Sequence, residues 1–311
     1  MWSKDTCFGF LKERKLNKSF YKRSCKSQNR TFADLLFPEV HASFAGKYTK
    51  PIYEKKPLNW HLKAQRLTVA SPKKEISILL PAHNEAWRIG GCIEAVEQAV
   101  KPFWGSYEII VSEDGSVDGT EAVVSSIAKA NTNVVFLHSQ VRLGKGKAIK
   151  NALRVAKGDV VVFMDVDLST NLKFLPIIAR LAKENRGLAI GSRHVEGARV
   201  KRPLSRTLFS LGYNIFVRAL FFDGVKDHQC GFKAMSRNFV DNIEDKVESD
   251  GWFFDTELIL RCKKTGFPLS EIGVDWTETR KKKESNVRLF RDASKMGRDL
   301  LKFKFRTLIP V

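Results

Sequence analysis

Two aspartates end a short apolar run in the stretch GDVVVFMDVDLST at residues 158–170. The run from Val160 to Met164 is typical of a strand that is buried on both faces, and Asp165 and Asp167 follow it one residue apart. Because side chains at positions i and i+2 share one face of an extended backbone, both carboxylates can point at one divalent cation. A strand end followed by a polar turn, without any metal, has the same sequence pattern. The two aspartates alone therefore do not decide between a cation site and a simple turn.

The elements that would position this pair precede it in the chain. Apolar runs at 76–80, 107–112 and 133–138 predict three more strands, and each is followed by a turn and a helix. Three strand-turn-helix units that feed a fourth strand predict an α/β fold with a mostly parallel, doubly wound sheet. Ligands of such sheets bind in the crevice beyond the carboxyl ends of the strands.

Polar side chains follow the other strand ends as well. Glu85 comes after the first strand, Asp114 after the second, and Lys145 lies in a Gly-Lys-Gly turn after the third. Carboxylates here can accept hydrogen bonds from a base and from ribose hydroxyls, while Lys145 and a metal held by Asp167 can neutralise a diphosphate. Capping of the glycine turn is the alternative role for Lys145. No GxGxxG follows the first strand and no GxxxxGK[ST] occurs, which argues against a dinucleotide-binding Rossmann domain and a P-loop NTPase.

Composition narrows the class of protein further. The 311 residues are 43% hydrophobic, which is typical of a soluble globular protein, and no window reaches the ~18–20 uninterrupted apolar residues of a transmembrane helix. The five cysteines form no CxxC pair, so neither a disulfide framework nor a zinc site is expected. A reducing compartment is the simplest inference.

The net charge of +20 is concentrated at the two ends of the chain. Residues 1–74 contain 17 Lys and Arg against 5 Asp and Glu, residues 280–311 contain 11 against 3, and the block between them has 26 of each sign. Basic ends around a neutral block suggest attachment to an anionic surface, either membrane or nucleic acid, and solvated tails are the alternative. We expect a basic, partly disordered extension at 1–72, a folded domain at 73–280 and a basic amphipathic helix at 281–311.

The chain contains, in this order, the motifs PAHNEA, SEDGSVDGT, RLGKGKA, DVDLST and GSR. Together they resemble the nucleotide-sugar half of the inverting family-two glycosyltransferases, which have the GT-A fold. Later segments read DHQCGFKAMSR at 227–237, WFFDTELIL at 252–260 and VDWTETRKKKES at 274–285. These look like the dolichyl-phosphate β-glucosyltransferase branch, with dolichyl-phosphate mannosyltransferases as nearest relatives, and the resemblance covers about residues 75–308.

The resemblance implies roles on the donor side of the site. The base and ribose site would be lined by Pro81, Ala82 and Glu85, with Asp114 on the base. Asp165 would reach the ribose or the metal, and Asp167 would ligate Mg²⁺ or Mn²⁺ together with the diphosphate. A cation there would take up charge that develops on the leaving nucleoside diphosphate.

On the acceptor side, the matching positions are Arg193 of GSR and Arg206, which would face phosphates, Asp227 near the reacting centre, and Gln229 and Lys233 in the same loop. A lipid phosphate has a second pKa near ~6, so it is already largely an anion at neutral pH and a strong general base is optional. The site must instead supply positive charge that holds this phosphate in line with the anomeric carbon, a task suited to Arg193, Arg206 and Lys233. Asp227 is then either a base or orienting group, or a structural cap for the QCGFK turn.

The function implied by the resemblance is metal-dependent, inverting transfer of a hexose, in the first place glucose from UDP-glucose, to a dolichyl or polyprenyl phosphate for protein N-glycosylation. Two departures from the family pattern keep alternatives open. First, this chain has DVDLST where the glucosyl branch usually has DADGAT, and Ser169 takes the position of a Gln ligand in the mannosyl branch. Second, the GSK that normally follows the WTE motif is replaced here by KKKES. GDP-mannose as donor, and a protein or polysaccharide as acceptor, are therefore the alternatives within the fold.

Two segments are candidates for peripheral contact with a membrane, which the resemblance places at the cytosolic face of the endoplasmic reticulum. Residues 208–222 and about 292–308 have large apolar side chains on one side: Phe209, Tyr213, Phe216, Leu220 and Phe221 in the first, and Met296, Leu300 and Leu301 in the second. Each basic residue near an anionic membrane surface contributes at most ~1 kcal/mol to the free energy of binding. The alternative is that both helices pack on the sheet or on a second subunit.

A nucleic-acid-binding protein with a degenerate transferase fold is the alternative from a different class. The neutral central block and the acids on the sheet rim argue against it, so no nucleic-acid partner is expected. The aromatic run at 252–254 is expected in the core, with stacking on the sugar as the alternative, and Cys230 is expected to be a small buried residue.

Overall fold

The structure, a computed structural model, describes residues 73–279 and 289–308. The extension expected at 1–72 and the KKKES run at 281–285 lie outside the described residues. Among the residues that are described, no helix combines the length and the apolarity needed to span a bilayer.

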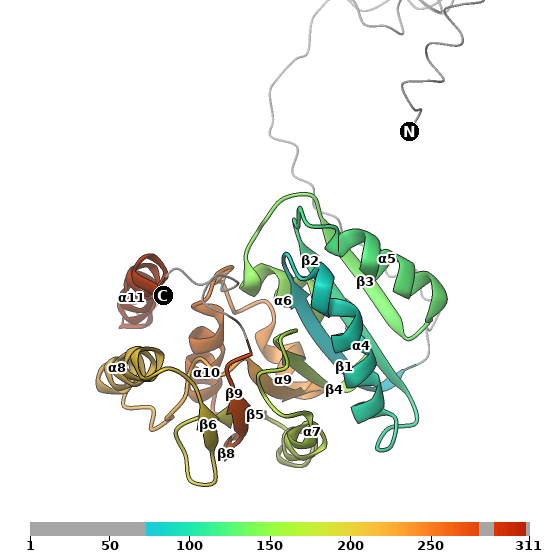
Figure 1. Cartoon of the computed structure of the whole chain (residues 1–311). Helices are drawn as coiled ribbons and strands as arrows, with labels where there is room; N and C mark the ends of the chain where they lie inside the picture. Colours follow the sequence, from blue (N-terminus) through green and yellow to red (C-terminus); the bar gives the residue numbers. More distant parts are fainter. Residues whose placement is uncertain (1–72, 280–288, 309–311) are drawn as a thin grey trace, which may run out of the picture. The chain divides into compact units, whose positions relative to one another are not determined.

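A seven-stranded sheet forms the centre of the fold (Figure 1). Its strands are β1 (Lys74–Ala82), β2 (Tyr107–Asp114), β3 (Val134–Ser139), β4 (Gly158–Met164), β5 (Leu188–Ser192), β7 (Phe232–Ser236) and β8 (Leu269–Gly273). They lie in the order β3-β2-β1-β4-β7-β5-β8, and β7 runs antiparallel to both of its neighbours while the other pairs are parallel. The predicted mostly parallel sheet is confirmed, and a short parallel pair, β6 (Arg199–Lys201) and β9 (Asp275–Thr277), lies beside it.

Helices cover both faces of the sheet. One face is covered by α4 (Ala86–Val100), α5 (Thr120–Ala130) and α7 (Leu175–Asn185), and the single 3-10 turn η2 (Leu172–Phe174) precedes α7. The other face is covered by α6 (Lys145–Val155), α9 (Arg237–Ile243) and α10 (Phe254–Thr265). Because successive strand residues point to opposite faces, Ile78 and Leu79 of β1 belong to different core clusters. Four consecutive residues of β4, Val160 to Phe163, are 1% exposed or less, as expected for a strand buried on both faces.

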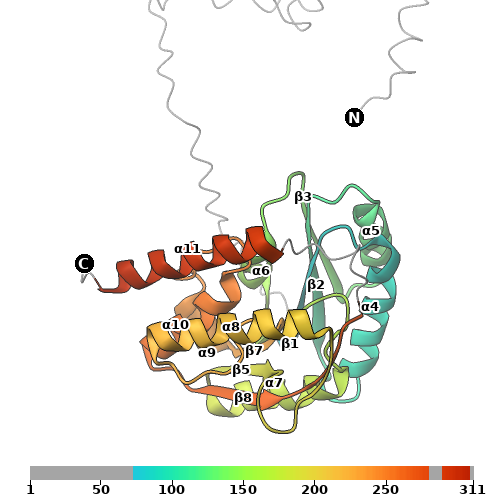
Figure 2. The ribbon, with the colours of Figure 1, turned by 60° about the vertical axis from the view of Figure 1, so that its left-hand side comes forward.

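Two long helices lie outside these layers. Figure 2 shows α8 (Leu204–Phe221) and α11 (Leu289–Leu308) alongside each other, in front of α10. They share a third apolar cluster in which Val217 and Leu300 are fully buried. Each helix thus uses part of its apolar surface to pack on the domain.

Candidate active site

The loops after β1 and β2 are tied to each other at the carboxyl end of the sheet. Pro81 and Ala82, the last residues of β1, are in register with the end of β2. Asn84 follows in a left-handed conformation with φ 56°; its N–H donates to Ser116 Oγ at 2.9 Å, and its Oδ1 accepts from the N–H of Val117, also at 2.9 Å. These bonds fix the two loops against each other at this rim of the sheet.

The two acids predicted to contact base and ribose are both buried at this rim. Glu85 is 2% exposed and lies 3.1 Å from Arg88 Nε. Asp114 is 4% exposed, and its carboxylate accepts from the N–H of Leu143 at 2.7 Å and of Gly144 at 2.9 Å. Asp114 therefore holds the loop that leads to Lys145.

Lys145 lies at the first position of α6, between two carboxylates. Its Nζ is 2.8 Å from Asp165 Oδ1 and 3.4 Å from Asp255 Oδ2. Asp255 Oδ1 is in turn 2.5 Å from the Nζ of Lys233, which also donates to the carbonyl of Cys230 at 2.6 Å. Burial alone would raise the pKa of Asp255, but the two ammonium groups outweigh burial and hold that pKa below its usual range. The charge of Lys233, which is fully buried, thus serves Asp255, and the structure does not bring it to an exposed phosphate position.

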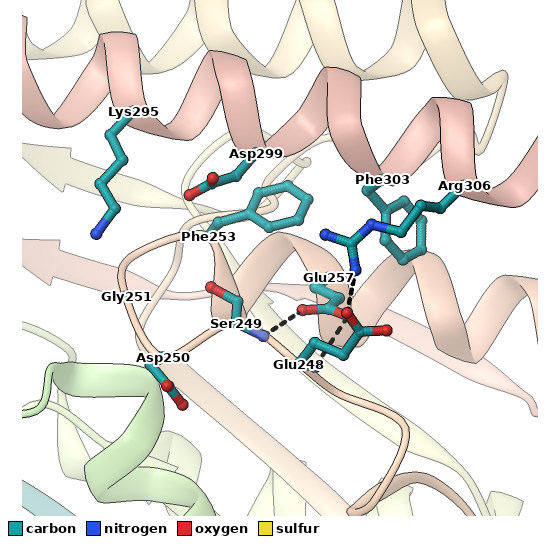
Figure 3. Close-up of a pocket in the computed structure, with 10 residues that line it drawn as sticks. All are labelled: Glu248, Ser249, Asp250, Gly251, Phe253, Glu257, Lys295, Asp299, Phe303 and Arg306. Carbon is teal, nitrogen blue, oxygen red and sulfur yellow. Dashed lines mark hydrogen bonds and ion pairs between the residues drawn. The ribbon is translucent and has the colours of Figure 1, made fainter.

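A pocket between α10 and α11 adjoins this region, and Figure 3 shows its lining. One wall is the loop 248–251, in which the carbonyl of Asp250 accepts the N–H of Lys147 at 3.1 Å. A Cβ at Gly146 would lie 2.6 Å from the carbonyl oxygen of Ser249, so the Gly-Lys-Gly turn can only approach this loop with glycine there. The wall therefore fixes the start of α6 and the backbone of Lys145.

Asp165 packs against a glycine of the DHQCGFK loop. A Cβ at Gly231 would lie 2.0 Å from Asp165 Oδ2, so this position accommodates the carboxylate only as glycine. The Asp165 side chain is partly buried, with 39% of it exposed. This partial burial and the negative charge of Asp167 raise the pKa of Asp165, although the ammonium of Lys145 opposes the change. Carboxylate oxygens are the ligands that Mg²⁺ and Mn²⁺ prefer, so the pair fits a divalent ion, although the described residues contain no cluster of three or more His, Cys, Asp or Glu that would hold one without other ligands.

The turn after Asp167 is held by the WTET segment. Asp167 Oδ1 accepts the N–H of Ser169 at 3.0 Å, and the hydroxyl of Thr279 donates to the carbonyl of Asp167 at 2.9 Å. Leu168 between them has φ 52°, a conformation that non-glycine residues adopt mainly where their surroundings enforce it. Ser169 Oγ lies 3.2 Å from Thr279 Oγ1, so its hydroxyl serves the turn.

Asp227 is bound to Arg193 in a bidentate pair. Arg193 Nε lies 2.7 Å from Asp227 Oδ2 and Nη2 lies 2.9 Å from Oδ1, and the backbone N–H groups of Arg193 and Gln229 also donate to this carboxylate. Burial alone would raise the pKa of Asp227, which is fully buried, but the guanidinium holds it well below the usual range. This arrangement favours the orienting and structural roles of Asp227 over a base.

Two arginines lie over the ring of Trp276 of β9, and a third pairs with Glu278, two residues further along the chain. The guanidinium carbons of Arg193 and Arg202 lie 5.5 and 5.2 Å from the Trp276 ring centroid, and Arg206 Nη1 donates to Glu278 Oε2 at 2.7 Å. The buried Nε and Nη1 of Arg202 have no hydrogen-bond partner within the described part of the chain. Burial, with the charge of Arg193 adding to it, lowers the pKa of Arg202 to about 10. A half-buried guanidinium in which two buried donors lack a partner is suited to an anion.

The helix α8 is anchored to both sides of this site. The Oδ1 of Asn214 accepts the N–H of His228 at 2.9 Å, and His228 Nε2 lies 2.8 Å from Asp223 Oδ2. The hydroxyl of Tyr213 is 2.9 Å from Thr256 Oγ1, at the start of α10. Movement of α8 is thereby linked to the residues next to Asp227 and Asp255.

Asp255 and Arg202 were missed by the sequence analysis. Asp255 is the one acid in the apolar run WFFDT, and a carboxylate among aromatic residues is a signal that could have marked it as paired. Arg202 lies in the segment RVKRPLSR together with other basic residues, so the sequence does not distinguish it from an ordinary surface arginine. Of the aromatic run, Phe253 and Phe254 are in the core as expected, and Cys230 is buried.

Comparison with known proteins identifies the family. The model of glycosyl transferase family 2 matches residues 77–244. A glycosyltransferase of Haloferax volcanii, AglD, is 36% identical over 231 residues, which are 73% of this chain and 36% of that protein. A dolichyl-phosphate β-glucosyltransferase of Dictyostelium discoideum is 30% identical over 250 residues, 76% of each chain.

Solved structures with the same fold include glucosyl-3-phosphoglycerate synthase from Mycobacterium tuberculosis, in complex with Mn²⁺, UDP and glucosyl-3-phosphoglycerate. It superimposes with a TM-score of 0.53 at 24% identity, covering 76% of this chain and 81% of that one. The chain therefore belongs to glycosyl transferase family 2 and is a glycosyltransferase with the GT-A fold, similar to the dolichyl-phosphate β-glucosyltransferases.

Proposed function

We propose that this protein transfers glucose from UDP-glucose to a dolichyl or polyprenyl phosphate, with inversion at the anomeric carbon and with Mg²⁺ or Mn²⁺ as cofactor. The similarity to dolichyl-phosphate β-glucosyltransferases supports the sugar and the acceptor, and the Mn²⁺ and UDP of the structural neighbour support the donor. We place the enzyme as a peripheral protein at the cytosolic face of the endoplasmic reticulum membrane.

The observation that carries the proposal is the half-buried guanidinium of Arg202, whose buried Nε and Nη1 donors have no hydrogen-bond partner among the described residues. Trp276, on which it stacks, forms a bridge with Thr170, three residues beyond Asp167. An anion bound by Arg202 would thus lie beside the turn of the predicted metal ligand, where a phosphate acceptor must be held to meet the donor sugar.

In this account the acceptor arrives as an anion, and the protein has only to hold and align it. Arg202 and Arg193 face the phosphate, and Asp227 keeps the guanidinium of Arg193 in place. Arg206 contributes charge from its pair with Glu278. No side chain has to remove a proton, because a phosphate monoester is already largely ionised at neutral pH.

The donor would lie on the rim formed by the loops after β1 and β2. Pro81, Ala82, Glu85 and Asp114 shape that rim. Asp167 and Asp165 would hold the divalent ion, which would supply positive charge against the diphosphate that leaves. GDP-mannose remains the alternative donor.

We assign the exposed face of α8 to the membrane surface. Its apolar side chains point away from the domain, with Leu204 81%, Leu208 67% and Ile215 50% exposed, and on the neighbouring helix α11 Phe305 is 65% exposed. A lipid phosphate must be reached from a bilayer surface, and an amphipathic helix that lies in the interface with basic neighbours can provide that contact.

Replacement of Arg202 by Gln is expected to raise the KM for dolichyl phosphate by roughly tenfold to hundredfold, because a hydrogen bond to a charged group contributes ~1.5–3 kcal/mol. The KM for UDP-glucose should stay as in the wild type. Initial rates with varied lipid and fixed donor would measure this. Arg199→Gln, an exposed neighbour on β6, is the matched control. An unchanged KM for the lipid in the Arg202 variant would contradict the assignment of the acceptor site.

Replacement of Leu208 by Glu is expected to weaken binding to vesicles of phosphatidylcholine and phosphatidylserine by at least about tenfold, since burying a leucine side chain contributes ~1.5–3 kcal/mol and a carboxylate adds repulsion. Co-sedimentation with vesicles gives the affinity. Ile177→Glu on α7, whose side chain is 48% exposed, is the control for a charge introduced elsewhere. Equal weakening by both variants would remove the special role of α8.

A further inference from the structure

We propose that Lys145 competes with the divalent cation for Asp165, and that Asp255 is a positioning residue that holds Lys145 when the cation binds. The inference rests on the proposed function in one respect, because it takes Asp165 and Asp167 as the metal ligands. It adds the ammonium group of Lys145 to that site, and it assigns a role to Asp255, which the proposed reaction does not use.

The first part of the argument is the contact between Lys145 and Asp165. The two charged groups are 2.8 Å apart, and the Lys145 side chain is only 11% exposed. An ammonium at this distance occupies a lone pair of Asp165 Oδ1, and two positive charges that share one carboxylate repel each other. A cation therefore binds to Asp165 more tightly when Lys145 withdraws.

The second part is the place to which Lys145 can withdraw. Asp255 Oδ2 already lies 3.4 Å from its Nζ, so a small rotation of the side chain suffices. Asp255 itself is 1% exposed and cannot follow the metal, because Lys233 holds its other oxygen and is in turn bound to the carbonyl of Cys230. The ring of Trp252, 5.3 Å from the ammonium, adds a second favourable contact for the charge.

Asp255 thereby sets how readily Asp165 is released. With Asp255 in place, Lys145 keeps an ion pair throughout, and the cost of separating it from Asp165 is largely offset. Without that carboxylate, Asp165 is the one carboxylate paired with Lys145 within residues 73–279 and 289–308, and Lys145 opposes the metal more strongly.

The test is the affinity for Mn²⁺, measured on the full chain with saturating UDP from the electron paramagnetic resonance signal of free Mn²⁺. Lys145→Met should bind Mn²⁺ more tightly, on the order of fivefold to tenfold, because the competing cation is gone. Lys150→Met is the matched control, since Lys150 is on the same helix but pairs with Asp250 at 2.6 Å, and it should leave the affinity unchanged. Asp255→Asn should weaken Mn²⁺ binding.

A double variant distinguishes this account from the alternative in which the negative charge of Asp255 attracts the metal ion directly, a field effect that does not involve Lys145. If Asp255 acts through Lys145, Asp255→Asn has no effect on Mn²⁺ affinity in the Lys145→Met background, whereas a field effect persists there and would overturn the proposal. Unchanged or weaker Mn²⁺ binding by Lys145→Met also overturns it. If Asp255→Asn melts at too low a temperature to be used, the comparison of the Lys145 and Lys150 variants decides alone. Wild-type protein that binds no Mn²⁺ with UDP would refute the metal role in the proposed function together with the inference, while normal wild-type binding with unresponsive variants refutes the inference alone.

Discussion

Asp167→Ala is expected to reduce the transfer rate by roughly 10²–10³-fold or more, the range found when one group that stabilises developing charge is removed. Asp167 lies in the turn that follows β4, three residues after Met164, and its carboxylate is the predicted ligand of the ion that faces the diphosphate. Rates at saturating donor and lipid would give the loss in kcat. Asp159→Ala at the other end of β4, where the acid pairs with Lys73, is the matched control and should retain activity.

A second variant separates the metal role of Asp167 from its role in the turn. The amide oxygen of Asp167→Asn can still accept the N–H of Ser169, which the carboxylate accepts at 3.0 Å, but it lacks the negative charge. We expect a loss close to that of the Ala variant. Near wild-type activity of Asp167→Asn would show that the residue serves the turn and not a cation.

Asp227→Asn is expected to lower kcat/KM for the lipid acceptor by about 10²-fold, comparable to the loss of one well-placed charge-stabilising group. The variant would leave the buried guanidinium of Arg193 without its counter-charge, which also costs about 3–5 kcal/mol of stability. Because Arg193 holds the pKa of Asp227 well below the usual range, this carboxylate is ionised throughout the neutral range. Its contribution to stability is present above the ordinary carboxyl pKa of about 4 and is lost as the pH falls through the lower value in the folded protein.

A double variant tests whether Asp227 does more than orient Arg193. If it only orients Arg193, the variant that combines Asp227→Asn with Arg193→Gln loses no more kcat/KM than Arg193→Gln alone. A further loss in the double variant would show that Asp227 acts on the reaction independently of Arg193, as a base would.

The sheet was predictable from sequence because its strands carry strong local signals. The run from Val160 to Met164 is apolar at every position, and the observed β4 ends at Met164 as expected. β7 could not be placed in the same way, because its antiparallel insertion between β4 and β5 depends on the path of the chain after α8. Spacing alone does not encode that path.

The partners of the site residues were harder to predict than the residues themselves. The motif named Lys233, but its pairing with Asp255 depends on side chains 22 residues apart in sequence that meet only in the folded core. Arg202 became a candidate only because its buried Nε and Nη1 donors have no hydrogen-bond partner in the described part of the chain. Sequence patterns thus predicted which residues follow the strand ends, whereas the network of charges behind them required the tertiary structure.

The most direct test of the account is to incubate the full chain with Mg²⁺, dolichyl phosphate and either labelled UDP-glucose or labelled GDP-mannose, and to measure the label that enters chloroform. We predict a chloroform-soluble β-glucosyl lipid from UDP-glucose, no product from the Asp167→Ala variant, and little or none from GDP-mannose. Label that enters the lipid only from GDP-mannose, or equal yields from wild type and Asp167→Ala, would contradict it.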